Sequence, residues 1–98
     1  MGLRSLGKGE IVMLIEQTLE MRGMPHRDLE EYFLSIGGKQ AELGTYVFSN
    51  WKVELKEEQC LTMGSLHIPA TFVTFRVEEE DWPRIVDAFH LRFLSAGG

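Results

Sequence analysis

The period of the apolar residues changes along the chain, and this change constrains the fold more than any other feature. Leu29, Phe33 and Ile36 would share one face of a helix over residues 25–36. From residue 44 onward apolar and polar residues alternate, which is the period of a strand that buries one face. A helix followed by several such segments predicts an α+β fold with an antiparallel sheet.

Two helices have recognisable ends. Pro25 suits the first turn of the helix over residues 25–36, and Gly37-Gly38 supplies a glycine able to take positive φ where that helix ends. A second helix is predicted over residues 82–95, with Asp81 as its N-cap and Pro83 in its first turn. Its buried stripe comprises Trp82, Ile85, Val86, Phe89 and Phe93.

The alternating segments predict four strands between these helices, over residues 45–49, 51–57, 60–68 and 71–78. Gly64 is the place for a bend in the third strand, and Pro69 suits a strand end, an edge or a bulge. Residues 11–22 fit the period of a strand and that of a helix about equally, and their pattern leaves both open.

Composition narrows the class of protein. The chain has 98 residues, a formal net charge of −5 and one cysteine, Cys60. One domain able to hold a core without an internal disulfide is expected, in a reducing cytoplasmic compartment. The acidic balance argues against a nucleic-acid partner. No apolar run reaches the ~20 residues of a membrane span, so no membrane association is expected. Residues 1–10 are interpreted as a flexible N-terminal arm.

Three blocks of sequence resemble a known family. They are residues 29–34 closing on Gly37-Gly38, then Gly44-Thr45-Tyr46, and then residues 63–69, Met-Gly-Ser-Leu-His-Ile-Pro. Together they resemble the C-terminal domain of MoaD-related proteins. In that family the domain follows a ubiquitin-like domain akin to the small subunit of molybdopterin synthase, and this sequence has no such half.

The resemblance implies a TBP-like β-α-β4-α fold for residues 11–98, as a single domain. It would make residues 11–22 a strand in a curved five-stranded antiparallel sheet, with both helices on one, concave, face. The family offers no established activity and no site residues to carry over. The missing ubiquitin-like half weakens the expectation of direct sulfur transfer.

Four aromatic residues are candidates for binding. Tyr46, Phe48, Trp51 and Trp82 could line a small-ligand site between sheet and helices, although aromatic residues at alternating positions more often form core. If Tyr46 and Phe48 pointed away from the helices, they would expose an apolar patch of the kind that binds partners.

Catalytic and metal-binding motifs are absent from the sequence. His67 is the best placed of the three histidines for a binding role, because it lies in the segment 64–69 beside a predicted bend. No Cys and His spacing matches a metal site, and no base, nucleophile and oxyanion donor can be grouped. We therefore expect no enzymatic activity, no cofactor and no metal.

The sequence ends in Gly97-Gly98. Ubiquitin-like sulfur carriers end in the same pair, which an activating enzyme must thread to reach the carboxylate. Here the pair follows a predicted helix directly, so the simpler interpretation is that it ends that helix.

Three functional hypotheses follow. The first is a non-enzymatic interaction or regulatory module linked to molybdopterin cofactor or sulfur-carrier metabolism. Its partner would be a ubiquitin-like sulfur carrier, the activating enzyme of that carrier, or a second copy of the chain as a homodimer. The alternatives are a small-ligand binding domain with its site between sheet and closing helix, and a sulfur carrier acting through Gly98.

Overall fold

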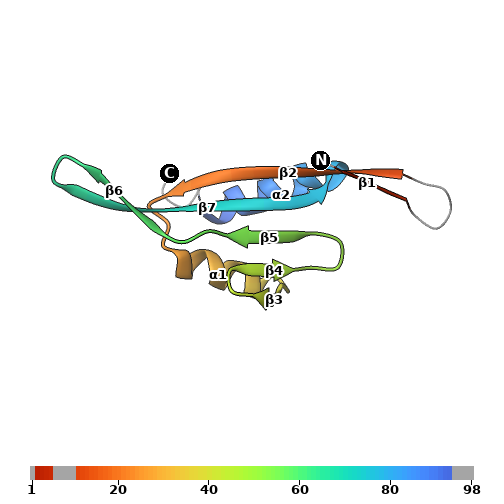
Figure 1. The fold of residues 1–98 in the computed structure, drawn as a ribbon, viewed down its shortest axis with the longest axis horizontal. Coiled ribbons are helices and arrows are strands. Elements are labelled where there is room, and N and C mark those ends of the chain that lie inside the picture. Colours follow the sequence, from red (N-terminus) through yellow and green to blue (C-terminus); the bar gives the residue numbers. More distant parts are fainter. Residues whose placement is uncertain (1, 6–10, 94–98) are drawn as a thin grey trace. The chain divides into compact units, whose positions relative to one another are not determined.

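The computed structural model describes residues 2–5 and 11–93 (Figure 1). In chain order the elements are β1 (Gly2–Ser5), β2 (Ile11–Arg22), α1 (His26–Ser35), β3 (Lys39–Glu42), β4 (Thr45–Val47), β5 (Lys52–Leu55), β6 (Gln59–Met63), β7 (Leu66–Glu78), the 3-10 helix η1 (Glu79–Asp81) and α2 (Trp82–Phe93). The predicted α+β class is confirmed, and residues 11–22 form a strand as the resemblance implied.

The described strands form one seven-stranded sheet in the order β1-β2-β7-β5-β4-β3, with β6 paired to β7. Strand β4 pairs with β5, and β5 pairs with β7, both antiparallel. The expected count of five strands is therefore wrong. Strand β3 was missed because all of its residues are exposed and carry no apolar period. Strand β1 lies in the segment expected to be a flexible arm, where Gly2–Ser5 pairs with residues 11–14.

The chain divides into two compact units, described here one at a time. One unit contains β1, the start of β2, the end of β7, η1 and α2. The other unit, Glu16–Arg76, contains the remaining elements.

Strands β2 and β7 run antiparallel within the unit Glu16–Arg76. Arg76 contacts Glu16, the hydroxyl of Thr74 contacts that of Thr18 at 2.9 Å, and the Pro69 carbonyl accepts the Gly23 N–H at 2.7 Å. Each step forward along β2 is matched by an equal step back along β7, so all these contacts belong to one register. The last of them lies one residue beyond Arg22, where β2 ends.

Helix α1 begins and ends close to the predicted residues. Pro25 is its N-cap, with φ −63° and ψ 149°. At the other end Gly38 donates its N–H to the carbonyl of Phe33 at 2.9 Å, and Gly37 donates to Leu34 at 3.2 Å. Gly37 has φ +103°. This pair of bonds with a positive-φ glycine is a Schellman motif, which satisfies carbonyls that the helix leaves free.

Apolar residues of α1 and of the strands fill the core of the unit Glu16–Arg76. Leu29, Phe33, Val53, Val73 and Phe75 have no exposed surface. The predicted alternation of β5 and β7 is confirmed, because Val53, Leu55, Val73 and Phe75 are all buried. Thr74 departs from this pattern, since it is 7% exposed although its neighbours on β7 point into the core.

In the other unit, helix α2 buries Ile85, Phe89 and Phe93, as predicted. The start of α2 differs from the prediction, because Asp81 belongs to the 3-10 turn η1, which leads into the helix at Trp82. Residues 94 and 95 of the predicted helix lie outside the described residues.

The predicted third strand over residues 60–68 is wrong. Gly64 has φ +64° and lies in a two-residue turn between Met63 and Leu66. Glycine with positive φ at the first position of such a turn is typical of type II′ hairpins. Residues 59–63 are therefore β6, and residues 66–78 form one long strand, β7, with Pro69 inside it.

Candidate interaction site on the β6–β7 hairpin

The β6–β7 hairpin separates its side chains into two chemically different faces. Paired residues of an antiparallel hairpin lie on the same face, and faces alternate along each strand. Leu61 pairs with Ile68 and Met63 with Leu66, so these residues share one face. This set, Leu61, Met63, Leu66 and Ile68, is named the apolar hairpin face. The opposite face carries Cys60, Thr62, His67 and Pro69.

The apolar hairpin face is open to solvent. Met63 is 53% exposed and Leu66 is 62% exposed, while Leu61 and Ile68 are half-buried. Single exposed apolar residues such as Leu43 are ordinary on protein surfaces. Four on one face of one hairpin form a patch, and such patches mark interaction surfaces.

The hairpin extends beyond its neighbours within the unit Glu16–Arg76. Gly23 contacts Pro69, after which the chain leaves the sheet and enters α1, so Leu66 lies beyond the end of β2. Figure 1 shows the tip of the hairpin reaching past β5 and α1. A two-stranded ribbon without further strands is only marginally stable in water, which favours a partner for it.

The base of the hairpin is tied to α1 by one carboxylate. Glu58 directly precedes β6, and its Oε1 accepts the backbone N–H of His26 at 2.8 Å. His26 is the first residue of α1, where free N–H groups favour a negative charge. Beyond this anchor, residues 59–75 contain no Asp, Glu, Lys or Arg. The hairpin is thus an uncharged ribbon on an acidic chain.

The predicted aromatic candidates fall into different places. Tyr46 and Phe48 gather around Phe33 of α1, with ring centroids 6.4 Å from it in both cases, and Trp51 lies 6.5 Å away. Phe48 and Trp51 stack on each other with centroids 3.8 Å apart and planes 3° apart. They form a half-buried edge to the core rather than an exposed patch.

Tyr46 does not face solvent. Its side chain has no exposed surface, and its hydroxyl donates a hydrogen bond to the carboxylate of Glu30 on α1. Burial, together with the negative charge of Glu30, raises the pKa of Tyr46 far above its usual range. An apolar patch containing Tyr46 on the outer face of the sheet is therefore wrong.

The outer face of β2, β7 and β5 is polar instead. The Arg76 guanidinium contacts Glu16 on β2 at 2.7 Å and also Glu54 on β5. The hydrogen bond from Arg76 lowers the pKa of Glu16, and the bond to Glu16 raises the pKa of Arg76. This mixed-charge row offers neither the apolar surface of a partner site nor a basic one.

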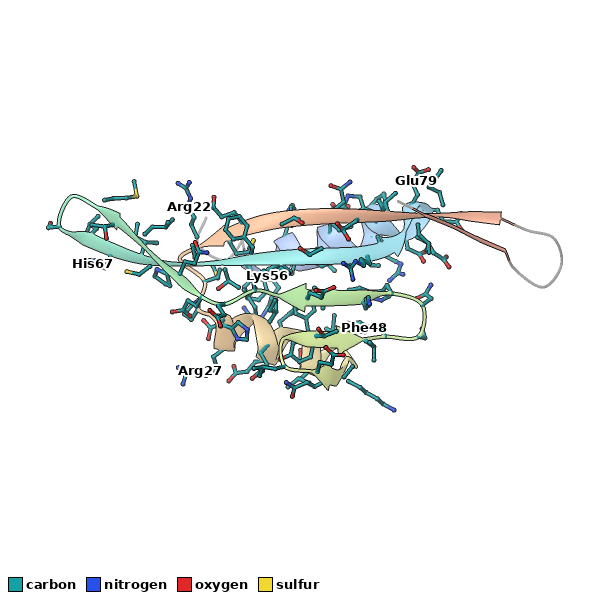
Figure 2. The ribbon with its side chains drawn as sticks, viewed as in Figure 1. Arg22, Arg27, Phe48, Lys56, His67 and Glu79 are labelled. Atoms are coloured by element: carbon teal, nitrogen blue, oxygen red, sulfur yellow. The ribbon has the colours of Figure 1, made fainter. Side chains whose placement is uncertain are left out.

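The remaining predicted site residues do not join these groups. His67 is exposed on the hairpin, on the face opposite the apolar one, and Figure 2 shows it at the other end of the unit from Phe48. Trp82 is half-buried at the start of α2, in the other unit. Gly97 and Gly98 lie outside the described residues.

The described part of the chain contains neither a metal-binding cluster nor a membrane-spanning helix. No three His, Cys, Asp or Glu side chains among residues 2–5 and 11–93 gather in a way that could hold a metal ion. No helix in these same ranges is long and apolar enough to cross a membrane.

The four residues of the apolar hairpin face were not predicted from the sequence. The signal was present in the sequence. Before Gly64, one polar residue separates Leu61 from Met63, and after Gly64 one polar residue separates Leu66 from Ile68. Interpreting Gly64 as a bend rather than a turn placed these residues on one continuous strand. In that arrangement they do not form a common face.

These features define a small α+β protein with an antiparallel sheet and an exposed, uncharged hairpin. The chain belongs to the family of archaeal MoaD-like proteins, whose model matches residues 17–98. The MoaD-related character indicated by the sequence is thereby confirmed. No curated protein matches the chain.

Proposed function

We propose that this protein is a non-enzymatic interaction module of molybdopterin or sulfur-carrier metabolism, and that it binds its partner through the apolar hairpin face. Membership of the MoaD-like family supports the metabolic context. The observation that carries the proposal is the presence of Leu61, Met63, Leu66 and Ile68 on one solvent-facing side of a projecting hairpin. We place the protein in the cytoplasm, in keeping with its single exposed thiol.

The proposed partner is a ubiquitin-like sulfur carrier or the enzyme that activates it. An uncharged hairpin face can meet an apolar patch on such a protein without desolvating a charge. The TBP-like arrangement, with a curved sheet and both helices on one face, is part of this proposal.

The test compares two substitutions that differ only in the face they alter. Leu66→Glu places a charge on the apolar hairpin face, and His67→Glu places the same charge on the opposite face. Calorimetric titration with a ubiquitin-like sulfur carrier, and separately with its activating enzyme, should show binding weakened by about 30-fold or more for Leu66→Glu. His67→Glu should bind as the unaltered protein does. Equal effects of the two substitutions, or no binding to either protein, would contradict the proposal.

A second candidate is a sulfur carrier, because the family match extends through Gly97-Gly98. In that case the chain purified from its own cells would carry sulfur in place of one oxygen on Gly98. The mass of the denatured chain and of its C-terminal peptide would show this exchange.

A further inference from the structure

The backbone of β6 presents hydrogen-bonding groups on its outer edge. In an antiparallel strand the N–H and C=O of one residue point to the same side, and the side alternates from residue to residue. The Pro69 carbonyl points to Gly23 and thus away from β6. Its pairing partner Cys60 must then also point away from β7. By the same alternation Thr62 points outward, while Leu61 points to β7.

No residue that the structure describes blunts this outer edge. Among the described strands β7 is the only partner of β6. Proteins protect free edges with charges, prolines or bulges, because such edges pair with other chains. Strand β6 contains no charge and no proline, and its register with β7 runs without a shift. The other edge of the hairpin does have such a device, because Pro69 offers no N–H there.

We propose that the outer edge of β6 pairs with β6 of a second copy of this chain, antiparallel about a two-fold axis at Leu61. This register places Cys60 opposite Thr62 of the second copy, and Thr62 opposite its Cys60. All outward N–H and C=O groups of both residues are then satisfied by four backbone hydrogen bonds. The contact is isologous, which is the symmetry of most homodimers.

Charge supports a second copy in this orientation. The chain carries a net charge of −5, so two copies repel each other, and the repulsion is weakest where they meet through uncharged surface. Residues 59–75 provide such a surface. In the antiparallel register Glu58 lies opposite Gly64 of the second copy, and Glu57 lies opposite Ser65. A parallel register would instead bring each glutamate against itself.

Dimerisation would enlarge the apolar hairpin face, which the proposed function uses. The proposal of a dimer does not depend on that function. A two-fold axis perpendicular to the hairpin keeps the two apolar hairpin faces on the same side. Leu61 of each copy would then lie side by side at the centre of a four-stranded sheet. Dimerisation rests on the edge of β6 and partner binding on the face, so substitutions can separate them.

The first experiment measures the dimer dissociation constant by sedimentation equilibrium, up to about 1 mM chain. The unaltered protein should dimerise. Thr62→Pro removes an N–H that points outward, so it breaks no hydrogen bond to β7. Pro69 lacks the corresponding N–H on the other edge of the hairpin. Thr62→Pro eliminates two of the four intermolecular bonds and should raise the dissociation constant about 30-fold or more. Thr62→Val keeps the N–H and should leave the constant unchanged.

A second experiment does not depend on the folding of the proline variant. In a Cys60→Ser background, Leu61→Cys places two thiols directly opposite each other across the axis, where an antiparallel pair can form a disulfide. Mild oxidation should cross-link it, whereas Met63→Cys in the same background lies opposite Gln59 and should stay uncross-linked. A monomer at every concentration, a folded Thr62→Pro variant that dimerises normally, or equal cross-linking at both positions would overturn the proposal.

Discussion

The hydroxyl of Tyr46 on β4 donates a hydrogen bond to the carboxylate of Glu30 on α1, although Tyr46 is fully buried and Glu30 is only half-buried. The bond joins a strand to the helix that covers it. It also satisfies the one polar atom that the Tyr46 side chain carries into the core. Phe33 stacks near the same ring, so the hydroxyl lies at the boundary of an aromatic cluster.

Tyr46→Phe should lower the free energy of unfolding by about 1–2 kcal/mol, because it removes a hydrogen bond to a charged group while keeping the ring in place. Chemical denaturation of the two proteins measures the difference. An unchanged unfolding midpoint for Tyr46→Phe would show that the bond contributes nothing to stability.

Stability should fall at alkaline pH because of Tyr46. Its pKa in the folded protein lies above that of the unfolded chain, so the folded state holds this proton more tightly. The contribution is fully present below about pH 10 and decreases above it, by about 1.4 kcal/mol per pH unit. Between neutral pH and pH 11 the free energy of unfolding should therefore fall less with pH for Tyr46→Phe than for the unaltered protein. The same pH dependence of the free energy of unfolding in the two proteins would contradict the raised pKa of Tyr46.

Gly38→Ala should destabilise the protein by about 1–3 kcal/mol. A Cβ at this position would lie 2.7 Å from the carbonyl oxygen of Phe33 and 2.7 Å from the Phe48 ring. The backbone oxygen cannot move without breaking the end of α1. Thermal unfolding measures the effect.

Gly37 provides a matched comparison for Gly38. A Cβ there would meet nothing within 4 Å, but φ is +103°. Gly37→Ala should therefore cost only the backbone term, about 1 kcal/mol. A smaller loss of stability for Gly38→Ala than for Gly37→Ala would contradict this prediction.

The Glu16 carboxyl should titrate at a lower pH than an ordinary glutamate, because Arg76 donates a hydrogen bond to it. The stabilisation is present above the unfolded pKa and is lost as pH falls through the folded value. NMR titration of the side-chain carboxyl carbon should show the pKa of Glu16 returning to its usual range in Arg76→Gln.

The sequence predicted those parts of the fold whose signals are local. Helix α1 follows from its apolar stripe and from Gly37, and the buried positions of β5 and β7 follow from alternation. The exposed strand β3 has no such signal, because its place in the sheet depends on pairing with β4. Gly64 was ambiguous because one glycine within an alternating segment fits a bend and a hairpin turn equally well.

The site was harder to predict than the fold. One interpretation of the sequence placed Tyr46 on the surface. Its hydrogen-bond partner lies on another element, and no local pattern links Tyr46 to Glu30. The apolar hairpin face became visible only when the turn at Gly64 paired Met63 with Leu66. Pairing across a turn determines the face, and the alternation alone does not.

Glu58 connects the hairpin to α1 through the backbone N–H of His26. A rearrangement of the hairpin on binding would pull on this bond and loosen or tighten the first turn of the helix. The His26 amide therefore serves as a natural reporter of events at the hairpin. Its hydrogen-exchange rate should change when a partner binds, even if the partner does not contact α1.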